Sequence, residues 1–425
     1  MHIKPKHSDL AVETSAPVRL PSAVLGFLTV TLCLYFVWAG FDLFRELVQH
    51  NHDLHMSPFY GLTHRYDLGC FRQRFYYFHS PAFFYNYPAT ETFMYPPLMA
   101  VLYKFFYFFH FQNRWFYGLT EAAICLMMAL LARNLRHRGL FAYRIGLLLG
   151  CTLLLSYPLY FENYLGNMEI CVFIILAAGV WAFFYSRGYT AAACFGVAGA
   201  LKIFPLVYVG LLLARKQYRQ TIFALAVAAA STVAAFWLVC PVMSTSVRGI
   251  QSGLGEFRIR YMLQFRFENR FDHSIYALIK ALFPAVRQST LAPHALSVYL
   301  LVAASLGTVL YFWKIRNLAV YNQVLALSVA SVVLPPTSHD YTLLHMYIPW
   351  ALLVICALDS EKRRVRISGL MSAFVCFAIL FAPETEFIVY GRSYGGQIKA
   401  LTLIALFLLA LRHRFPSSFD EASEV

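Results

Sequence analysis

Residues 24–43 read VLGFLTVTLCLYFVWAGFDL, an apolar run whose single charged residue, Asp42, comes at its end. At about 1.5 Å of rise per helical residue, such a run spans the ~30 Å hydrocarbon core of a bilayer. It is too long for a cleaved signal peptide and lacks a small-residue cleavage site, so we expect it to remain as a first span. The preceding Lys4, Lys6 and Arg19 predict a cytoplasmic N-terminus.

The rest of the chain has the same apolar character. Of its 425 residues, 60% are hydrophobic and only 13% are charged, and the mean hydropathy is +0.57. A soluble protein could not bury so much apolar surface, so the surrounding solvent is mostly lipid. The apolar stretches are continuous rather than alternating, which favours helices over a β-barrel. We therefore predict an all-α integral membrane protein, a multi-span bundle of about 10–12 helices with a large first extracytoplasmic loop.

The net charge of +14 indicates where the spans end. Alone it could suggest nucleic-acid binding, but cytoplasmic basic loops and anionic lipid explain it better, and we expect no nucleic-acid partner. Taking the short basic loops as cytoplasmic predicts spans near residues 23–44, 115–132, 145–161, 168–186, 220–240, 295–313, 319–335, 342–357, 367–382 and 398–411. We expect one transmembrane domain over residues 23–414, between cytoplasmic tails at 1–22 and 415–425.

Successive spans must cross the membrane in opposite directions, and two segments do not fit this rule. Residues 190–214 have two cytoplasmic ends but too little length for two crossings, which predicts a pair of short helices turning near Lys202 and Pro205. The apolar run at 95–111 must then fail to cross fully, and its two leading prolines predict a tilted or re-entrant helix.

The same topology predicts large extracytoplasmic loops at residues 45–94 and 242–294 and a short one at 335–341. Aromatic residues crowd the first loop, as in FYYF at 75–78, which predicts that it lies on the bilayer surface. The nine cysteines are scattered, mostly within predicted spans, and indicate neither a disulfide framework nor a metal site.

Most residues capable of chemistry fall in these extracytoplasmic gaps. Asp67 lies in the first loop, where its carboxylate could accept the proton of a sugar hydroxyl. The alternative is a structural ion pair with a nearby arginine: Arg65, Arg72 or Arg74. The rival carboxylates are Asp42 and Asp53.

Lys202 lies in an apolar run, three residues before Pro205. A lysine far from a helix end costs about 2.5–3.5 kcal/mol on insertion scales, so it usually faces a polar cavity or a partner. An ammonium at a helix break could hold a phosphate, although snorkelling to the interface is the alternative. In the Tyr95-Pro96-Pro97 run, rigid helix initiation is the simpler interpretation.

The second large loop interleaves arginines with aromatic residues. Arg258, Arg260 and Arg266 stand beside residues such as Tyr261 and Phe265, a combination that suits an anionic lipid headgroup or a diphosphate. For any single arginine, a solvated surface position is the more common outcome. Farther along, the pair His339 and Asp340 is placed to orient a leaving group or an acceptor, and too few ligands accompany it for a metal site.

The ordered set of motifs resembles the GT-C membrane glycosyltransferases, and among them glycosyltransferase family eighty-seven, the polyprenyl-phosphate-mannose-dependent mannosyltransferases. The resemblance rests on Asp67, Tyr95-Pro96-Pro97, Gly166-Asn167, and Lys202 with Pro205, and it covers residues from about 60 to 350. This chain departs from the family pattern at two places: Asp272-His273-Ser274 replaces an Asn-Gln-Ser-like site, and residues 335–339 read PPTSH. Either departure could signal a different sugar or acceptor.

The resemblance implies transfer of a single hexose, with mannose inherited from the family, from a polyprenyl-phosphate carrier to an extracytoplasmic acceptor. Asp67 would be the general base of an inverting displacement. The further residues that we expect in the site are His339 and Asp340 for catalysis, Lys202, Arg258, Arg260 and Arg266 for the donor phosphate, and Tyr95, Asn167, His273 and Ser274 for substrate binding. The enzyme would lie in the cytoplasmic (inner) membrane with its active site facing outward.

The expected partners are the polyprenyl-phosphate sugar, a glycolipid or glycan acceptor and membrane lipid. No cofactor or metal ion is expected, because fixed cations can stabilise the departing phosphate. Three alternatives remain open: a transporter or flippase of lipid-linked sugars, which often shows internal repeats, a ligase or polymerase that uses polyprenyl-diphosphate glycans, and a structural subunit without activity.

Overall fold

The computed structural model describes residues 19–49, 66–84, 93–109, 112–263, 272–283, 291–365, 367–383, 388–389, 392–393 and 395–416. Nearly every regular element in these ranges is a helix. The exception is an antiparallel hairpin of two-residue strands, β1 (Ile388–Val389) and β2 (Arg392–Ser393). The predicted all-α, multi-span membrane architecture is confirmed.

Six helices of the described chain are long and apolar enough to cross a bilayer. They are α1 (Ser22–Gln49), α4 (Gln112–His137), α10 (Tyr218–Val239), α13 (Ala292–Trp313), α15 (Tyr347–Arg363) with the preceding 3-10 turn η8 (Asp340–Met346), and α17 (Gly395–Arg412). A seventh crossing is possible if the bent pair of α5 (Ala142–Leu154) and α6 (Tyr157–Leu165) counts as one span.

The remaining apolar helices have 10–17 residues. They are α3 (Pro97–Phe108), α7 (Glu169–Phe184), α8 (Gly188–Leu201), η3 (Phe204–Tyr208) with α9 (Val209–Ala214), α14 (Val320–Val333) and α16 (Leu370–Phe381). α14 is buried along nearly its whole length and packs against α15 and α17. A helix surrounded by protein need not match the bilayer thickness, so hydropathy alone could not separate these interior helices from lipid-facing ones.

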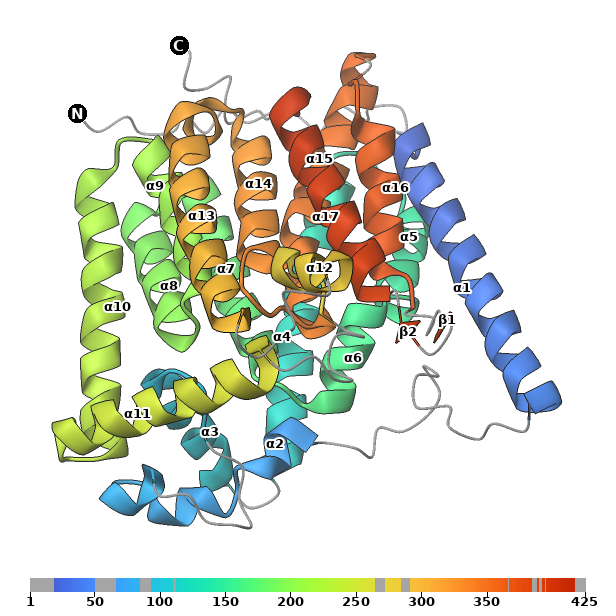
Figure 1. Ribbon diagram of the computed structural model, residues 1–425. Helices are drawn as coiled ribbons and strands as arrows, with labels where there is room; N and C mark the ends of the chain where they lie inside the picture. Colours follow the sequence, from blue (N-terminus) through green and yellow to red (C-terminus); the bar gives the residue numbers. More distant parts are fainter. Residues whose placement is uncertain are drawn as a thin grey trace.

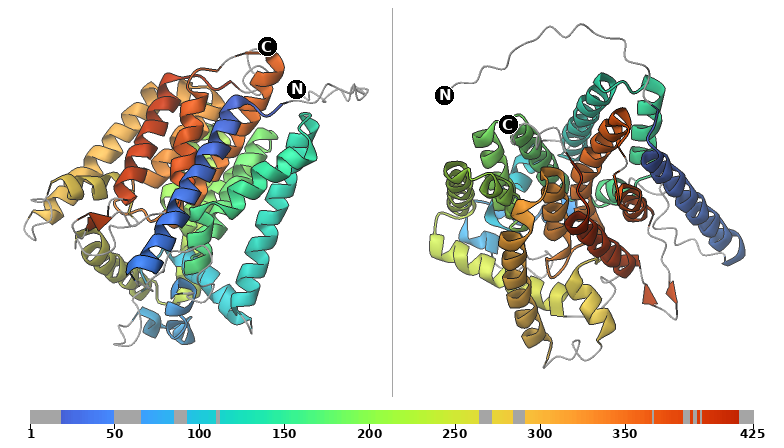
Figure 2. Two further views of the ribbon diagram at one scale, coloured as in Figure 1. Left: turned by 90° about the vertical axis from the view of Figure 1, so that its right-hand side faces the viewer. Right: turned by 90° about the horizontal axis from the view of Figure 1, so that it is seen from above.

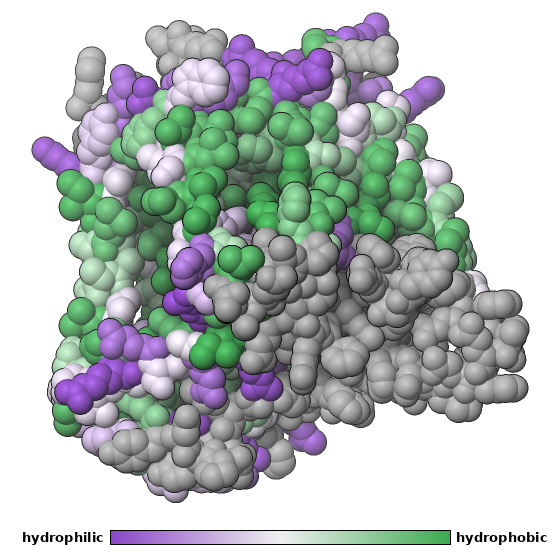
Figure 3. Space-filling model, in the orientation of Figure 1, coloured by the Kyte–Doolittle hydropathy of each residue, from purple (hydrophilic) through white to green (hydrophobic). Residues whose placement is uncertain are grey.

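The basic segments gather at one end of the bundle. α4 ends in Arg136 and His137, α15 in Lys362 and Arg363, and α17 in Arg412. These ends lie at the top of the molecule in Figure 1 and in the left view of Figure 2. Figure 3 shows hydrophilic residues along this upper end and a hydrophobic band below it. The arrangement follows the charge pattern expected of cytoplasmic loops.

The predicted pair of short helices at 190–214 is confirmed. α8 ends at Leu201, Lys202 is extended (φ −145°, ψ 139°), and η3 begins at Phe204. Pro205 lies in the first turn of η3 and has no N–H to continue the preceding helix, so the chain turns there. The predicted failure of the 95–111 run to cross fully agrees with the 12-residue length of α3, which begins at Pro97.

The predicted span at 145–161 is a bent pair rather than one straight helix. Ser156 is extended between α5 and α6 (φ −94°, ψ 114°), and the helix axis bends by 52° from α5 to α6. Pro158 is tolerated in the first turn of α6 but would break a continuous helix. The bend brings α6 against η8, which places two candidate segments side by side.

Several aromatic residues of the first loop pack into the hydrophobic core of the bundle. Phe71, Phe75, Phe83 and Phe93 are buried, and rings of this group meet one another and Tyr103 at centroid distances of 5.3–6.2 Å. Tyr76 and Tyr77 of the same run are exposed, so the position of this loop on the bilayer surface stays a prediction. Aromatic side chains are shielded from water either by packing against one another or by lying at the membrane interface. Composition alone does not distinguish these two placements.

Helices also occupy the described part of the second large loop. α11 (Met243–Phe257) continues into a π-helical turn, η4 (Arg258–Leu263), and α12 (Ile275–Leu282) follows farther along the chain. α11 lies across the lower end of the bundle in Figure 1. At Gly253 it lies against the backbone just before Tyr95: an added Cβ there would be 2.3 Å from the carbonyl oxygen of Phe93.

We expect Gly253→Ala to lower the melting temperature of the purified protein in detergent, because the obstructing atom belongs to the backbone and cannot rotate away. Gly255→Ala is the matched control in the same helix. Nothing lies within 4 Å of its added Cβ, so helix propensity should leave it neutral or more stable by about 0.5–1 kcal/mol. Equal melting temperatures for the two variants would contradict the close approach at Gly253.

Phe415 follows the predicted end of the domain at residue 414 and still packs against the bundle. The Phe415 side chain is buried, and its backbone N–H donates to Asn322 Oδ1 (2.8 Å). Asn322 Nδ2 in turn donates to the carbonyl oxygen of Ala410 (2.7 Å). The contacts of Asn322 fasten the end of α17 to the interior helix α14.

Candidate active site

Asp67 lies in α2 (Tyr66–Cys70), and the segment after α6 holds its carboxylate. Asn167 Nδ2 donates to Asp67 Oδ2 (2.7 Å), and Asn167 Oδ1 accepts from the backbone N–H of Glu169 (2.9 Å). The second contact fixes the orientation of the amide, so that its NH2 group faces the carboxylate. Two predicted site residues that are 100 positions apart are thus in direct contact.

Gly166 makes this contact possible. It adopts a left-handed conformation (φ 65°) at the end of α6, where its N–H donates to the carbonyl oxygen of Glu162 (2.8 Å). A Cβ at this position would lie 2.9 Å from the Tyr117 hydroxyl and 3.3 Å from Leu68 Cβ. Glycine therefore supplies both the helix cap and the space for α2 to approach.

The alternative ion pairs of Asp67 do not form within the described residues. Arg74 is buried and its Nη1 donates to the carbonyl oxygen of Phe83 (2.9 Å), while Arg72 is exposed. Arg65 and Asp53, like the side chain of Asp42, lie outside the described part of the chain. The hydrogen-bond partner of Asp67 is thus a neutral amide, and no arginine of the described chain neutralises the carboxylate.

The surroundings raise the pKa of two predicted site residues, Asp67 and Tyr95. Burial raises the pKa of the Asp67 carboxyl, and the Asn167 hydrogen bond and the Lys202 charge oppose this rise. Burial, and after it the Asp67 charge, raises the pKa of the Tyr95 phenol well above its ordinary value. A carboxylate with a raised pKa binds a proton more readily, and Tyr95 stays protonated as a possible donor.

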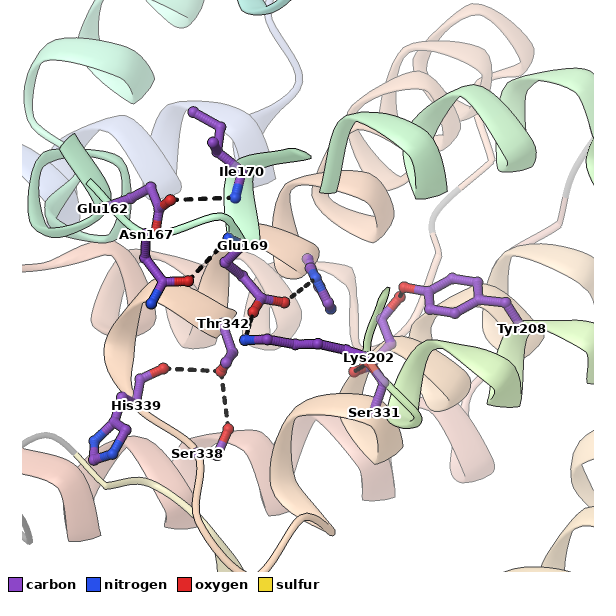
Figure 4. A network of polar contacts seen from close by, with 12 residues as sticks. Glu162, Asn167, Glu169, Ile170, Lys202, Tyr208, Ser331, Ser338, His339 and Thr342 are labelled. Carbon is purple, nitrogen blue, oxygen red and sulfur yellow. Dashed lines mark hydrogen bonds and ion pairs between the residues drawn. The ribbon is translucent and has the colours of Figure 1, made fainter. Parts of the chain in front are cut away.

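Lys202 forms an ion pair with Glu169 at the start of α7, and Glu169 Oε1 lies 2.9 Å from His345 Nε2 of η8. Figure 4 shows the Lys202 side chain extended from the break after α8 toward Glu169. The Glu169 side chain is 1% exposed and that of Lys202 is 18% exposed, so Lys202 is the more accessible member of the pair. Sequence reasoning missed Glu169 and His345, although a glutamate in an apolar helix was the available signal.

The Lys202 ammonium also lies between two aromatic rings. Its Nζ is 5.0 Å from the centroid of the Tyr341 ring and 5.9 Å from that of the Tyr95 ring. The positive charge is close enough to Asp67 to lower the pKa of that carboxyl. Asp67, Tyr95, Asn167 and Lys202, which come from four separate segments, therefore form one site.

A second buried carboxylate, Glu162, stands beside this site. Its Oε1 accepts from the backbone N–H of Ile170 (3.2 Å), and its Oε2 is buried with no hydrogen-bond partner in the described part of the chain. Glu162 is near enough to Glu169 and Lys202 for their charges to interact. The site therefore contains more acidic groups than the motifs indicated.

The predicted substrate-binding residues His273 and Ser274 are buried and engaged internally. His273 Nδ1 lies 3.3 Å from Asp340 Oδ1, and its Nε2 lies 3.1 Å from the hydroxyls of Ser338 and Thr342. Ser274 Oγ accepts from the backbone N–H of Ala277 and so caps α12. Both side chains hold the segment before η8 in place rather than facing the Lys202 site.

His339 differs from its neighbours because its ring nitrogens make no hydrogen bond to the described part of the chain. Its ring centroid lies 5.8 Å from that of Tyr341 and 6.5 Å from that of Tyr261. Burial lowers its pKa, so the imidazole is neutral and can donate one hydrogen bond. In Figure 4 the ring stands apart from the dashed contacts of Thr342 and Ser338. The adjacent Asp340 is instead fully buried.

The arginines lie at the margin of the site. Arg258 and Arg260 are exposed on η4, and the Arg260 guanidinium carbon is 5.5 Å from the centroid of the adjacent Tyr261 ring. Because Tyr261 also meets His339, η4 connects the outer surface to the site. Arg266 lies outside the described residues, which contain no cluster of three or more potential metal ligands.

Comparison with known proteins identifies the family. The model of glycosyltransferase family 87 matches residues 93–338, more than half of the 425-residue chain. The match includes Tyr95, Asn167 and Lys202, whereas Asp67 precedes it. No curated protein and no solved structure matched the chain. The chain belongs to glycosyltransferase family 87.

Proposed function

We propose that the protein transfers a single hexose, with mannose as the first candidate, from a polyprenyl-phosphate carrier to a glycolipid or glycan acceptor outside the cytoplasm. The observation that carries the proposal is the placement of the Asp67 carboxylate and the Lys202 ammonium in one site. A transferase of this kind needs a base for the acceptor and a cation for the departing phosphate, and this site contains both.

In the proposed reaction the acceptor oxygen attacks the anomeric carbon while Asp67 takes the hydroxyl proton. The bond from the anomeric carbon to the phosphate oxygen breaks, and its electron pair remains on the polyprenyl phosphate. A single displacement inverts the anomeric centre, as in inverting glycosidases. Asn167 orients the base through its hydrogen bond to Asp67 Oδ2.

The departing phosphate gains negative charge, which Lys202 and His339 would stabilise. Lys202 has a counter-ion in Glu169, so the phosphate would share the ammonium with that carboxylate. His339 offers an imidazole N–H, and the exposed Arg258 and Arg260 would attract the headgroup from the membrane surface. Arg266 belongs to the same proposal.

The site would face the extracytoplasmic side of the cytoplasmic membrane. Basic helix ends lie at the opposite end of the bundle from α2 and α11, and positively charged loops stay in the cytoplasm. The polyprenyl tail would then lie among the lipid-facing helices, with its phosphate at the interface.

The proposal is tested with purified protein in liposomes supplied with polyprenyl-phosphate mannose and, separately, with a polyprenyl-diphosphate glycan. We expect chemical transfer of the sugar from the monophosphate donor to an acceptor glycolipid. Movement of either lipid across the bilayer without cleavage would identify a flippase instead. Transfer from the diphosphate donor alone would identify a ligase or polymerase.

The raised pKa of Asp67 predicts how activity depends on pH. The carboxylate is the active form, so kcat/KM should fall as the pH drops through this pKa. Asn167→Leu removes a hydrogen bond that lowers the pKa of Asp67, so the acidic limb of the profile should move to higher pH. Asn134→Leu at the basic end of α4 is the control and should leave the limb in place. A slower Asn167→Leu enzyme with an unshifted limb would contradict this role.

A further inference from the structure

A second buried charge network lies beside the Lys202 site. Lys399 Nζ donates to Asp340 Oδ2 (3.0 Å), and Asp340 Oδ1 lies 3.3 Å from His273 Nδ1. The Lys399 side chain is 5% exposed, and those of Asp340 and His273 are 0% exposed. The Lys399 ammonium also lies 4.5 Å from the centroid of the Tyr157 ring. No motif in the sequence indicated Lys399.

The network joins three segments that are far apart in the chain: the residues just before α12, the start of η8, and the first turns of α17. The backbone N–H of His273 donates to the Ser338 carbonyl oxygen (2.9 Å), and that of Ser338 donates to Asp272 Oδ1 (3.0 Å). The Thr342 N–H and hydroxyl both donate to the carbonyl oxygen of His339 (2.8 and 2.9 Å). The backbone on each side of His339 is therefore fixed.

Stability alone is a weak reason for this arrangement. Removing a lysine and an aspartate from water costs energy that their attraction often fails to recover, and an apolar replacement of both is frequently neutral or stabilising. Among the side chains that the network holds in place is His339, whose ring nitrogens make no hydrogen bond to the described part of the chain. That ring is near enough to Lys202 for the lysine charge to influence it.

We propose that Lys399 is a positioning residue that acts through Asp340 and His273. It fixes the backbone at residues 338–342 and so directs the His339 imidazole to the departing phosphate. The inference rests on the proposed function, in which His339 contacts that phosphate. It also assigns Asp340 to support of the site rather than to contact with substrate.

The test is a double-mutant cycle on transfer from polyprenyl-phosphate mannose in liposomes, using Lys399→Met and His339→Ala singly and together. If Lys399 acts through His339, Lys399→Met should lower kcat/KM about tenfold in the wild-type background and less than about twofold in the His339→Ala background. Arg138→Met is the control, because it breaks an ion pair with Asp359 at the basic end of the bundle. It should change the rate less than about twofold in both backgrounds.

An equal loss from Lys399→Met in both backgrounds would overturn the inference, because a general structural defect does not depend on His339. An undiminished rate for Lys399→Met would also overturn it. If Lys399→Met does not fold, Asp340→Asn replaces it in the cycle with the same criteria. Absence of transfer by the wild-type protein would contradict the proposed function itself, so the two failures are distinguishable.

Discussion

Asp67→Asn should lower kcat for sugar transfer about 10²–10⁴-fold, the contribution expected of a general base. The amide has nearly the shape of the carboxylate and can still accept from Asn167 Nδ2, so folding and donor binding should survive. What is lost is the group that takes the acceptor proton. Transfer from labelled polyprenyl-phosphate mannose in liposomes measures the effect.

Asp359→Asn is the matched control for this experiment. Asp359 is paired with Arg138 at the basic end of the bundle, and its side chain is 21% exposed. The substitution removes the same charge far from the site and should leave kcat close to that of the wild type. If Asp67→Asn were equally harmless, Asp67 would not be the base.

The second large effect is expected at Lys202. Lys202→Met leaves the buried Glu169 with His345 as its only remaining ion-pair partner in the described chain. Breaking a buried pair by removing one partner typically costs about 3–5 kcal/mol, so the melting temperature should fall. Transfer should fall about 10²–10³-fold, as when one group that stabilises transition-state charge is removed.

The double variant Lys202→Met/Glu169→Gln separates these two effects. Neutralising Glu169 removes the unpaired charge, so most of the lost stability should return. Transfer should stay low, because no ammonium faces the departing phosphate. A double variant that regained both stability and turnover would show that Lys202 only balances Glu169.

The interrupted helices could be predicted from the sequence because their causes are local. A lysine and a proline in an apolar run indicated the turn at Lys202, and two prolines indicated the start of α3 at Pro97. The same reasoning missed the bend at Pro158, because the apolar character continues on both sides of it. Composition alone also did not reveal that α14 is an interior helix rather than a lipid-facing span.

The candidate site was predictable only in part. Asp67, Tyr95, Asn167 and Lys202 were identified from their order along the chain, and the structure places them together. The residues that contact them are brought there by tertiary packing, and no regular spacing in the sequence indicates such contacts. Glu169, His345 and Lys399 therefore went unnoticed, although each is a polar residue in an apolar helix.

The Asp272–Ser274 segment shows why the role of a polar residue depends on its packing. The resemblance to the family pattern suggested that His273 and Ser274 bind substrate, whereas in the structure their side chains bond to residues 336–342. A polar group satisfied by the protein and one left for a ligand look alike in sequence, because burial and partner geometry decide between them.

The most direct test of the account is whether residues 67 and 202 share one extracytoplasmic chamber. Asp67→Cys and Lys202→Cys would be made separately in a variant without the nine native cysteines and treated with a membrane-impermeant maleimide. We predict that both positions react from the extracytoplasmic side and that polyprenyl phosphate slows both reactions. Labelling of the two positions from opposite sides of the membrane would contradict the account.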